Sequence, residues 1–172
     1  VTDGKITIDG KDVRDVSQHE LREKLGYVPQ KAVLFSGDIA SNILYGNPDG
    51  SEAEMTEAAT IAQATEFIEQ KKKKYKSTIS QGGSNVSGGQ KQRLSIARAI
   101  AKHPDVYIFD DSFSALDYKT DATLRAKLKE KTSESTVMIV AQRISTILHA
   151  DQIIVLDDGQ IVGKGTHKEL LK

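Results

Sequence analysis

The residues best suited to chemistry lie at positions 85–94, in the string Asn-Val-Ser-Gly-Gly-Gln-Lys-Gln-Arg-Leu. Ser87 supplies a hydroxyl, and Gly88 and Gly89 let the backbone approach a phosphate closely. The helix that we expect to begin here offers unpaired N–H groups and the positive end of its dipole. The string predicts an anion site, although Ser-Gly-Gly taken alone is equally a plain turn and helix cap.

Two consecutive carboxylates, Asp110 and Asp111, follow the apolar run at 106–109. Ligand sites of α/β proteins form at the C-terminal ends of buried parallel strands. A hard oxygen ligand at that place suits Mg²⁺, which proteins hold with one or two carboxylates plus phosphates. The alternative is that Asp110 only caps the next element.

Three apolar runs, at 106–109, 137–140 and 153–156, must position these residues. Continuous runs rich in β-branched residues predict strands buried on both faces of a parallel sheet. Helical patterns at 120–131 and 141–148 separate the runs. The alternation of strand and helix predicts an α/β fold with crossover connections.

The N-terminal part has a different pattern. Residues 5–9 alternate in polarity and Gly10 turns the chain, which predicts a hairpin of an antiparallel sheet. Residues 25–28 form another short strand that Pro29 ends, and residues 51–69 have helical composition.

Two smaller features complete the pattern. Thr166 and Glu169 form a capping box for a short C-terminal helix. The basic run at 71–76 predicts a solvated loop or helix end, with phosphate or lipid-headgroup binding as the alternative.

Composition bounds the function. The 172 residues suit one domain with a sizeable core. A formal net charge of zero disfavours a nucleic-acid partner, since nucleic-acid binders usually carry a basic excess. The absence of cysteine excludes a disulfide framework, a thiolate zinc site and a thiol nucleophile. No run reaches the ~18 apolar residues that span a bilayer.

The chain opens with Val1 rather than methionine and shows no signal peptide. We therefore expect a soluble fragment of a longer protein, whose membrane link comes through covalently attached segments or a partner.

Taken together, these motifs resemble the ATP-binding domain of ABC transporters. Residues 87–90 resemble the ABC signature, residues 106–110 the Walker B strand, and residues 114–117 the D-loop. Gln30, in Tyr-Val-Pro-Gln, is similar to the Q-loop glutamine. The resemblance covers essentially the whole chain and implies an α/β, P-loop NTPase-like core with a parallel sheet, an antiparallel β front and a helical subdomain.

The resemblance also divides residues 1–172. It implies a β front with the Q-loop at about 1–48, a helical subdomain with the signature at about 49–102, and an α/β core with Walker B, D-loop and switch region at about 103–172.

The resemblance assigns roles to the residues of this chain's own core. Asp110 helps to hold Mg²⁺ through its waters, and Gln30 reaches the metal and the attacking water. Asp111 stands where the family has its general base, and Gln142 stands where the family has its switch histidine.

Other residues are implied to act across a dimer. In the family, two domains pair head to tail and bury two ATP molecules. Ser87, Gly88 and Gly89, with Gln90, then contact the ATP bound on the opposite subunit, and Asp117 signals across the interface.

A Walker A loop, G-x-x-x-x-G-K-[ST], does not occur in the chain. The nearest string, at 159–164, has only three residues between its glycines, and a turn explains it more simply. The resemblance places the loop before Val1, so the chain is expected to be truncated at its N-terminus. We predict that the 172 residues alone bind ATP weakly or not at all in calorimetry; micromolar affinity would contradict this.

Two further departures affect the same nucleotide site. Asp111 replaces the usual glutamate, and a carboxylate retracted by roughly 1 Å can cost ~10²-fold in rate, unless a local shift restores its reach. Gln142 replaces the usual histidine and cannot become cationic. The signature stays close to consensus, with only Val86 in place of leucine. This asymmetry is typical of the degenerate half of a heterodimeric multidrug-type exporter.

The predicted partners are a second, different ATPase domain and a transmembrane domain, at the cytoplasmic face of the cell membrane. The strings at 34–43, 81–84 and 163–171 are exporter-like. The alternatives are a soluble ABC-type ATPase of DNA repair or translation, and a non-catalytic module that ATP dimerises. The transported substrate is not specified by these residues.

Overall fold

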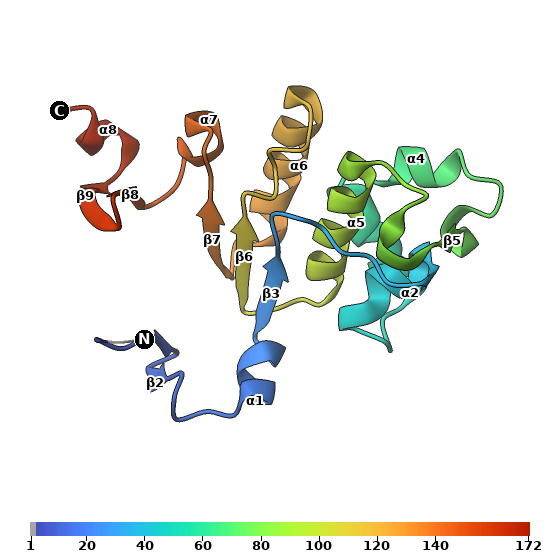
Figure 1. Cartoon of the computed structure of the whole chain (residues 1–172), viewed down its shortest axis with the longest axis horizontal. Helices are drawn as coiled ribbons and strands as arrows, with labels where there is room; N and C mark the ends of the chain where they lie inside the picture. Colours follow the sequence, from blue (N-terminus) through green and yellow to red (C-terminus); the bar gives the residue numbers. More distant parts are fainter. Residues whose placement is uncertain (1–2) are drawn as a thin grey trace.

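A computed structural model describes residues 3–172 and has a three-stranded parallel sheet at its centre (Figure 1). The strand order is β3 (Leu25–Val28), β6 (Val106–Asp110) and β7 (Thr136–Val140). Leu25 pairs with Val106, and Asp110 pairs with Val140. The helix α6 (Tyr118–Lys131) connects β6 to β7. The predicted α/β architecture is confirmed.

Residues between β3 and β6 form a helical region beside the sheet (Figure 1). Its helices and strands are α2 (Ile39–Ile43), α3 (Glu52–Ile61), α4 (Thr65–Glu69), α5 (Gly88–Ala101), and the antiparallel pair β4 (Gly37–Asp38) with β5 (Thr78–Ile79). Three 3-10 turns, η1 (Leu44–Gly46), η2 (Lys74–Lys76) and η3 (Gln81–Gly83), complete it. The helices predicted at 51–69 are confirmed.

The helix α5 lies between the sheet and the other helices. It contacts α2 and α3 on one side and β3 on the other. Leu94 and Ile96 are fully buried in one core with Val28 and Phe109 of the sheet. All of residues 94–101 except Arg98 are buried, so this part of α5 is covered on several sides. The core therefore fixes the body of α5 relative to the strand ends.

The first elements form a hairpin of β1 (Thr7–Ile8) and β2 (Lys11–Asp12), followed by α1 (Gln18–Glu23). The antiparallel hairpin is confirmed. Residues 25–28, however, do not extend this antiparallel front, because β3 pairs in parallel with β6. The sequence of a four-residue strand does not specify which strand it pairs with, and here that strand is β6.

The prediction that the apolar run at 153–156 belongs to the parallel sheet is wrong. β8 (Ile153–Asp157) is not a strand of the parallel sheet: it pairs antiparallel with β9 (Gln160–Gly165) in a separate hairpin. Asp158 and Gly159 both have positive φ, of 47° and 76°. Such a two-residue Asp-Gly turn favours a tight hairpin. The string 159–164 is thus a hairpin turn and strand, as the simpler interpretation had it.

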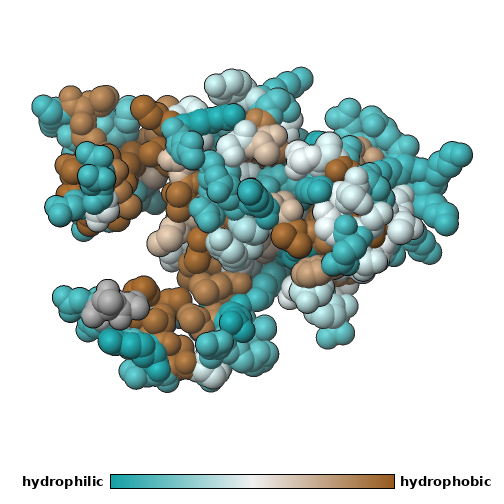
Figure 2. Space-filling view, in the orientation of Figure 1, coloured by the Kyte–Doolittle hydropathy of each residue, from teal (hydrophilic) through white to brown (hydrophobic). Residues whose placement is uncertain are grey.

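The strands β7 and β8 are also less buried than predicted. Val137, Met138 and Val140 of β7 are exposed, as are Ile154 and Leu156 of β8, so the prediction of strands buried on both faces is wrong for both runs. Figure 2 shows apolar surface on the side that carries the sheet and the two hairpins.

The last helices are short. The helical pattern at 141–148 contracts to α7 (Ile144–Ile147), while α8 (His167–Leu170) begins with the predicted capping box of Thr166 and Glu169. No helix within residues 3–172 combines the length and apolar character needed to cross a membrane.

Candidate functional site

The C-terminal ends of the three parallel strands are joined around Asp111. The Asp111 N–H donates to the Val140 carbonyl over 2.9 Å, and Ser112 Oγ donates to the Val28 carbonyl over 2.8 Å. Asp111 itself has a positive φ of 44°, which aspartate tolerates better than most residues. The chain therefore leaves β6 in a sharp turn that keeps both carboxylates at the edge of the sheet.

The Asp111 carboxylate accepts hydrogen bonds from two side-chain amides. Gln30 Nε2 donates to Asp111 Oδ2 over 3.0 Å, and Gln142 Nε2 reaches the same oxygen at 3.5 Å. Gln30 follows β3 and Gln142 follows β7, so the two strands flanking β6 each deliver one amide. The structure brings together three of the residues predicted for this site.

Asp110 has a partner that sequence reasoning missed. The Tyr27 hydroxyl donates to Asp110 Oδ2 over 3.1 Å, and this bond raises the pKa of Tyr27. Tyr27 lies between the buried residues Gly26 and Val28 of β3, so its side chain is on the opposite face, and no signal in the sequence pointed to this contact.

The donor set around Asp110 fits Mg²⁺. Within residues 3–172 no three histidines, cysteines or acidic residues gather into a metal cage. Mg²⁺ does not need one, because it keeps several waters and is held by one or two carboxylates plus phosphates. Asp110 and the adjacent Asp111 can supply those carboxylates.

The predicted anion site is the N-terminus of α5. Ser87 Oγ accepts from the Gln90 N–H over 3.2 Å, and Gln90 Oε1 accepts from the Ser87 N–H over 3.0 Å, which completes a capping box. Ser87 and Gly88 are exposed, and a Cβ added at Gly88 would meet nothing within 4 Å. The tip of the helix is ordered by its own residues and is open to a ligand.

The charge at this tip differs from that at three other helix starts. The capping boxes of α1, α3 and α8 use glutamates, namely Glu20, Glu54 and Glu169. Hydrogen bonds from the capping serine or threonine lower the pKa of each of these glutamates. In α5 the same place is taken by the neutral Gln90, and its first turn has no acidic residue. The positive end of this dipole is therefore not neutralised by the helix itself.

The loop at 111–117 lies between the strand ends and the tip of α5. A Cβ on Gly89 would lie 3.4 Å from the Ala115 carbonyl oxygen, so the loop lies against the tip of α5. Gln92, which is buried within α5, donates to the Pro29 carbonyl over 3.2 Å, next to Gln30. Ser87 and Asp110 thus belong to one surface over a common α/β core.

Asp117 is placed differently from the other predicted site residues. Its Oδ1 accepts from the Thr120 N–H over 3.0 Å as the N-cap of α6, and this backbone hydrogen bond lowers the pKa of Asp117. Its observed contacts are those of a helix cap at the end of the 111–117 loop.

Sequence reasoning also missed Arg98, a half-buried arginine of α5. Arg98 donates to the Asn42 side chain and to the Asn42 and Val33 carbonyls, at 2.9 to 3.0 Å. Its guanidinium lies over the rings of Phe35 and Tyr45, and burial lowers its pKa. The groove beside it has a volume of about 460 Å³ and includes Tyr27 in its lining. The available signal was an arginine among the mostly apolar residues at 94–101 of α5.

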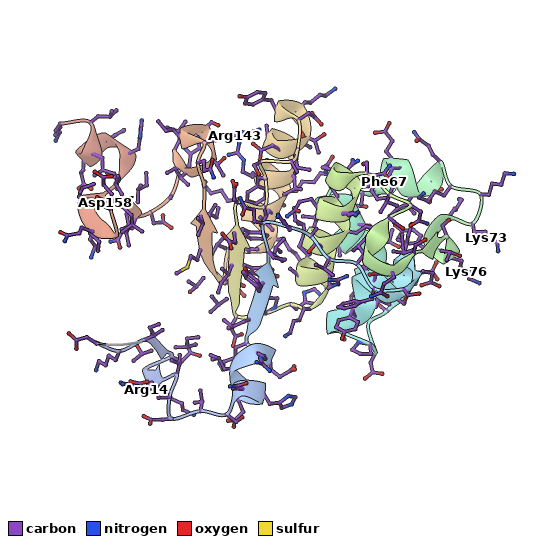
Figure 3. The ribbon with its side chains drawn as sticks, in the orientation of Figure 1. Arg14, Phe67, Lys73, Lys76, Arg143 and Asp158 are labelled. Carbon is purple, nitrogen blue, oxygen red and sulfur yellow. The ribbon has the colours of Figure 1, made fainter. Side chains whose placement is uncertain are left out.

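The basic run at 71–76 lies at the outer end of the helical region, and Figure 3 shows Lys73 and Lys76 there. Lys74 pairs with Glu69 at 2.6 Å, and its neighbours Lys72 and Lys73 are exposed. The run is solvent-exposed, as a solvated loop or helix end requires, and phosphate or lipid-headgroup binding stays the untested alternative.

Comparison with known proteins agrees with this geometry. The ABC transporter family profile matches residues 1–114. The chain belongs to the ABC transporter family. An uncharacterized ABC transporter ATP-binding protein of Mycobacterium bovis is 47% identical over 174 residues, which covers 99% of this chain and 30% of that protein. A Staphylococcus aureus protein named as a multidrug export ATP-binding/permease protein is 42% identical over 171 residues, with coverage of 99% and 30%.

The architecture agrees equally well. A bacterial Atm1-family ABC exporter, solved with ATP bound, superposes with a TM-score of 0.94 at 40% identity over 98% of this chain and 30% of that one. The chain is thus an ABC ATP-binding domain of the exporter type, and it spans about 30% of the length of the relatives it matches.

Proposed function

We propose that this ATP-binding domain binds and hydrolyses ATP to drive substrate export across a membrane. The observation that carries the proposal is the meeting of Gln30, Asp111 and Gln142 at the end of β6, beside Asp110. The family match and the Atm1-type architecture support it.

The residues at the strand ends would act on a nucleotide whose phosphates lie above the sheet. Asp110 would hold Mg²⁺, which neutralises charge on the phosphates when bound. Asp111 would orient the attacking water as a hydrogen-bond acceptor. Gln30 and Gln142 would fix the Asp111 carboxylate, since both amides point at its Oδ2.

The tip of α5 would serve the nucleotide of a second ATPase domain. Ser87 and Gly88 are exposed, Gly89 and Gln90 are half-exposed, and the positive helix end here is not neutralised, which suits a phosphate. Asp117 would act at the interface between the two domains. The expected division at about 1–48, 49–102 and 103–172 also remains a proposal.

We propose further that the nucleotide site on these strands is the degenerate one of a heterodimer. The Asp111 side chain is one methylene shorter than glutamate. Its hydrogen-bond donors, Gln30 and Gln142, are neutral amides and add no positive charge to the site. The matching active site would combine the partner's core with the α5 tip of this chain.

Comparing the ATPase activities of the full-length homodimer and heterodimer tests this idea. We expect slow turnover by the homodimer, raised ~10²-fold when Asp111→Glu is combined with Gln142→His. Asp105→Glu, at the exposed residue just before β6, is the matched control and should change nothing. Vigorous homodimer hydrolysis that the double substitution leaves unchanged would contradict the proposal.

The proposed partners are a transmembrane domain, in the same or another chain, and a second ATPase domain, at the cytoplasmic face of the membrane. The named permease function of the Staphylococcus aureus relative supports this more than it supports a soluble ATPase of DNA repair or translation. Sedimentation of the full-length protein with membranes, and its release by detergent, tests the assignment.

The second candidate is an ATP-dependent dimerisation module without turnover. Asp111 and Gln142 favour it for this chain's own site. Trapping of unhydrolysed ATP in the full-length protein, with no phosphate release, would select it over the exporting ATPase.

A further inference from the structure

Arg143 holds the backbone of the 111–117 loop. Its Nη2 donates to the Ser114 carbonyl over 3.0 Å, and its Nη1 donates to the Leu116 carbonyl over 3.4 Å. Its guanidinium carbon lies 5.2 Å from the centroid of the exposed Tyr118 ring. Figure 3 shows Arg143 at the end of the sheet, between α6 and α7. The planar fork of arginine can bind two carbonyls at once, which lysine cannot reproduce.

The same segment reaches the strand-end site. Arg143 directly follows Gln142, whose amide points at Asp111. Asp111 is the first residue of the 111–117 loop, and its carbonyl accepts from Ser114 Oγ over 2.8 Å. Arg143 and Gln142 therefore hold one loop at its middle and at its start.

The 111–117 loop and the segment that carries Gln142 and Arg143 meet around a very small cavity. Its volume is about 10 Å³, and its lining includes Asp111, Ser114 and Arg143. Such a space holds at most about one water. The 111–117 loop therefore has no room to move toward the segment that carries Gln142 and Arg143 unless that segment moves as well.

The far side of the loop lies against α5. The Ala115 carbonyl, which is 3.4 Å from a Cβ built on Gly89, stands between the two carbonyls that Arg143 holds. A shift of the α5 tip therefore displaces the part of the loop that Arg143 binds.

We propose that Arg143 is a positioning residue that transmits the position of the α5 tip to the Gln142–Asp111 pair. It would thereby couple the nucleotide site served by α5 to the site on this chain's own strands. This inference rests on the proposed function, because it assumes that both sites bind nucleotide.

Arg125 provides the matched control. It donates to the Ser145 carbonyl over 3.1 Å, and it pairs with the buried Asp121 at 2.8 Å. It thus fastens the same segment to α6 without a hydrogen bond to the 111–117 loop. A role in folding alone would make Arg125→Lys at least as harmful as Arg143→Lys.

The test is a double-mutant cycle in the full-length protein, with Arg143→Lys and Gly89→Leu; a Cβ at Gly89 would already lie in van der Waals contact with the Ala115 carbonyl, so the longer leucine side chain must push the loop. Each single change should lower kcat about 10- to 100-fold with little change in KM, because misplacement is the cause. If Arg143 relays the position of α5, the double variant should be about as slow as either single one. The proposal would be overturned if the effects of the two single substitutions on kcat multiply in the double variant. It would also be overturned if Arg125→Lys lowers kcat as much as Arg143→Lys does.

Hydrogen exchange in the same proteins needs no turnover. Arg143→Lys should speed amide exchange within residues 111–117 roughly tenfold, as expected for the loss of charged hydrogen bonds, while Arg125→Lys should not. Tyr118→Leu, a surface change, should give a smaller increase. Unchanged exchange in Arg143→Lys would overturn the proposal. If the two substitutions change amide exchange as expected but the unmodified full-length protein has no ATPase activity, the proposed function is contradicted instead.

Discussion

The tip of α5 and the ends of β3, β6 and β7 differ in how they are held and in the charge they present. At the tip, Ser87 and Gln90 bond to each other, and the positive helix end is open. At the strand ends, the Asp111 carboxylate accepts hydrogen bonds from the amides of Gln30 and Gln142, which follow β3 and β7. The carboxylates make this part of the site acidic. A magnesium nucleotide carries both anionic phosphates and a cation, so it complements both halves. The comparison indicates that neither half is a complete site.

The largest expected effect tests whether the body of α5 anchors its open tip. Leu94 is fully buried, so Leu94→Ala should lower the free energy of unfolding by ~2–5 kcal/mol. Ile161→Ala, at a side chain 62% exposed on β9, should change it by less than ~0.5 kcal/mol. Urea denaturation measures both. Equal losses would mean that the helical region is no better packed than the hairpin.

A second change breaks the acidic half. Asp110→Asn keeps the size of the side chain but removes its charge, so the Mg²⁺-dependent ATPase of the full-length heterodimer should fall ~10²-fold or more if this site turns over. Where the partner's site supplies all turnover, Mg²⁺-dependent nucleotide retention at this site should fall instead. Asp105→Asn is the control. Unchanged activity and retention would remove Asp110 from the site.

A third change reverses the charge of the tip. Gln90→Glu gives α5 the capping box of α1, α3 and α8, which should stabilise the fold by ~0.3–1 kcal/mol. The added carboxylate should also weaken ATP-dependent dimerisation about tenfold or more, because it faces a phosphate. Glu54→Gln, the opposite change on α3, should slightly destabilise the fold and leave dimerisation unaltered. Denaturation and sedimentation separate the two effects, and tighter dimerisation by Gln90→Glu would contradict the account.

The smallest effect concerns pH. The capping bonds lower the folded-state pKa of Glu20, Glu54 and Glu169 below the ordinary value of 4.5. The stability they contribute is therefore complete above that value and is lost as pH falls through the lowered pKa. Denaturation at pH 7 and pH 3.5 should show a smaller acid loss in Glu54→Gln than in the unmodified chain. Substitution of Gln90 by alanine should leave the acid loss unchanged, since this side chain does not titrate.

Much of the site could be predicted from the sequence, because its parts are local. The signature string specifies its own helix cap through Ser87 and Gln90, and the β6 run ends at the carboxylates. The partners of these parts depend on tertiary contacts. Nothing in the order of residues shows that Tyr27 reaches Asp110, or that Arg143 reaches the Ser114 carbonyl.

The fold was predictable to a similar depth. Apolar periodicity identified the strands but not their pairing, so β8 was assigned to the parallel sheet although an Asp-Gly turn joins it to β9. That turn was visible in the sequence. The exposure of β7 was not visible, because burial depends on what packs against a strand and not on the strand's composition.

The central claim is that one nucleotide site combines the α5 tip of one subunit with the strand-end aspartate of another. Mixing two inactivated full-length proteins tests it directly: Gly88→Arg, which blocks the tip, and Asp110→Asn, which disables the strand end. Each alone should fail to retain Mg²⁺-dependent ATP in a dimer, while the mixture should retain one nucleotide per mixed dimer. A mixture that retains no more than its components would show that both halves must lie in the same chain.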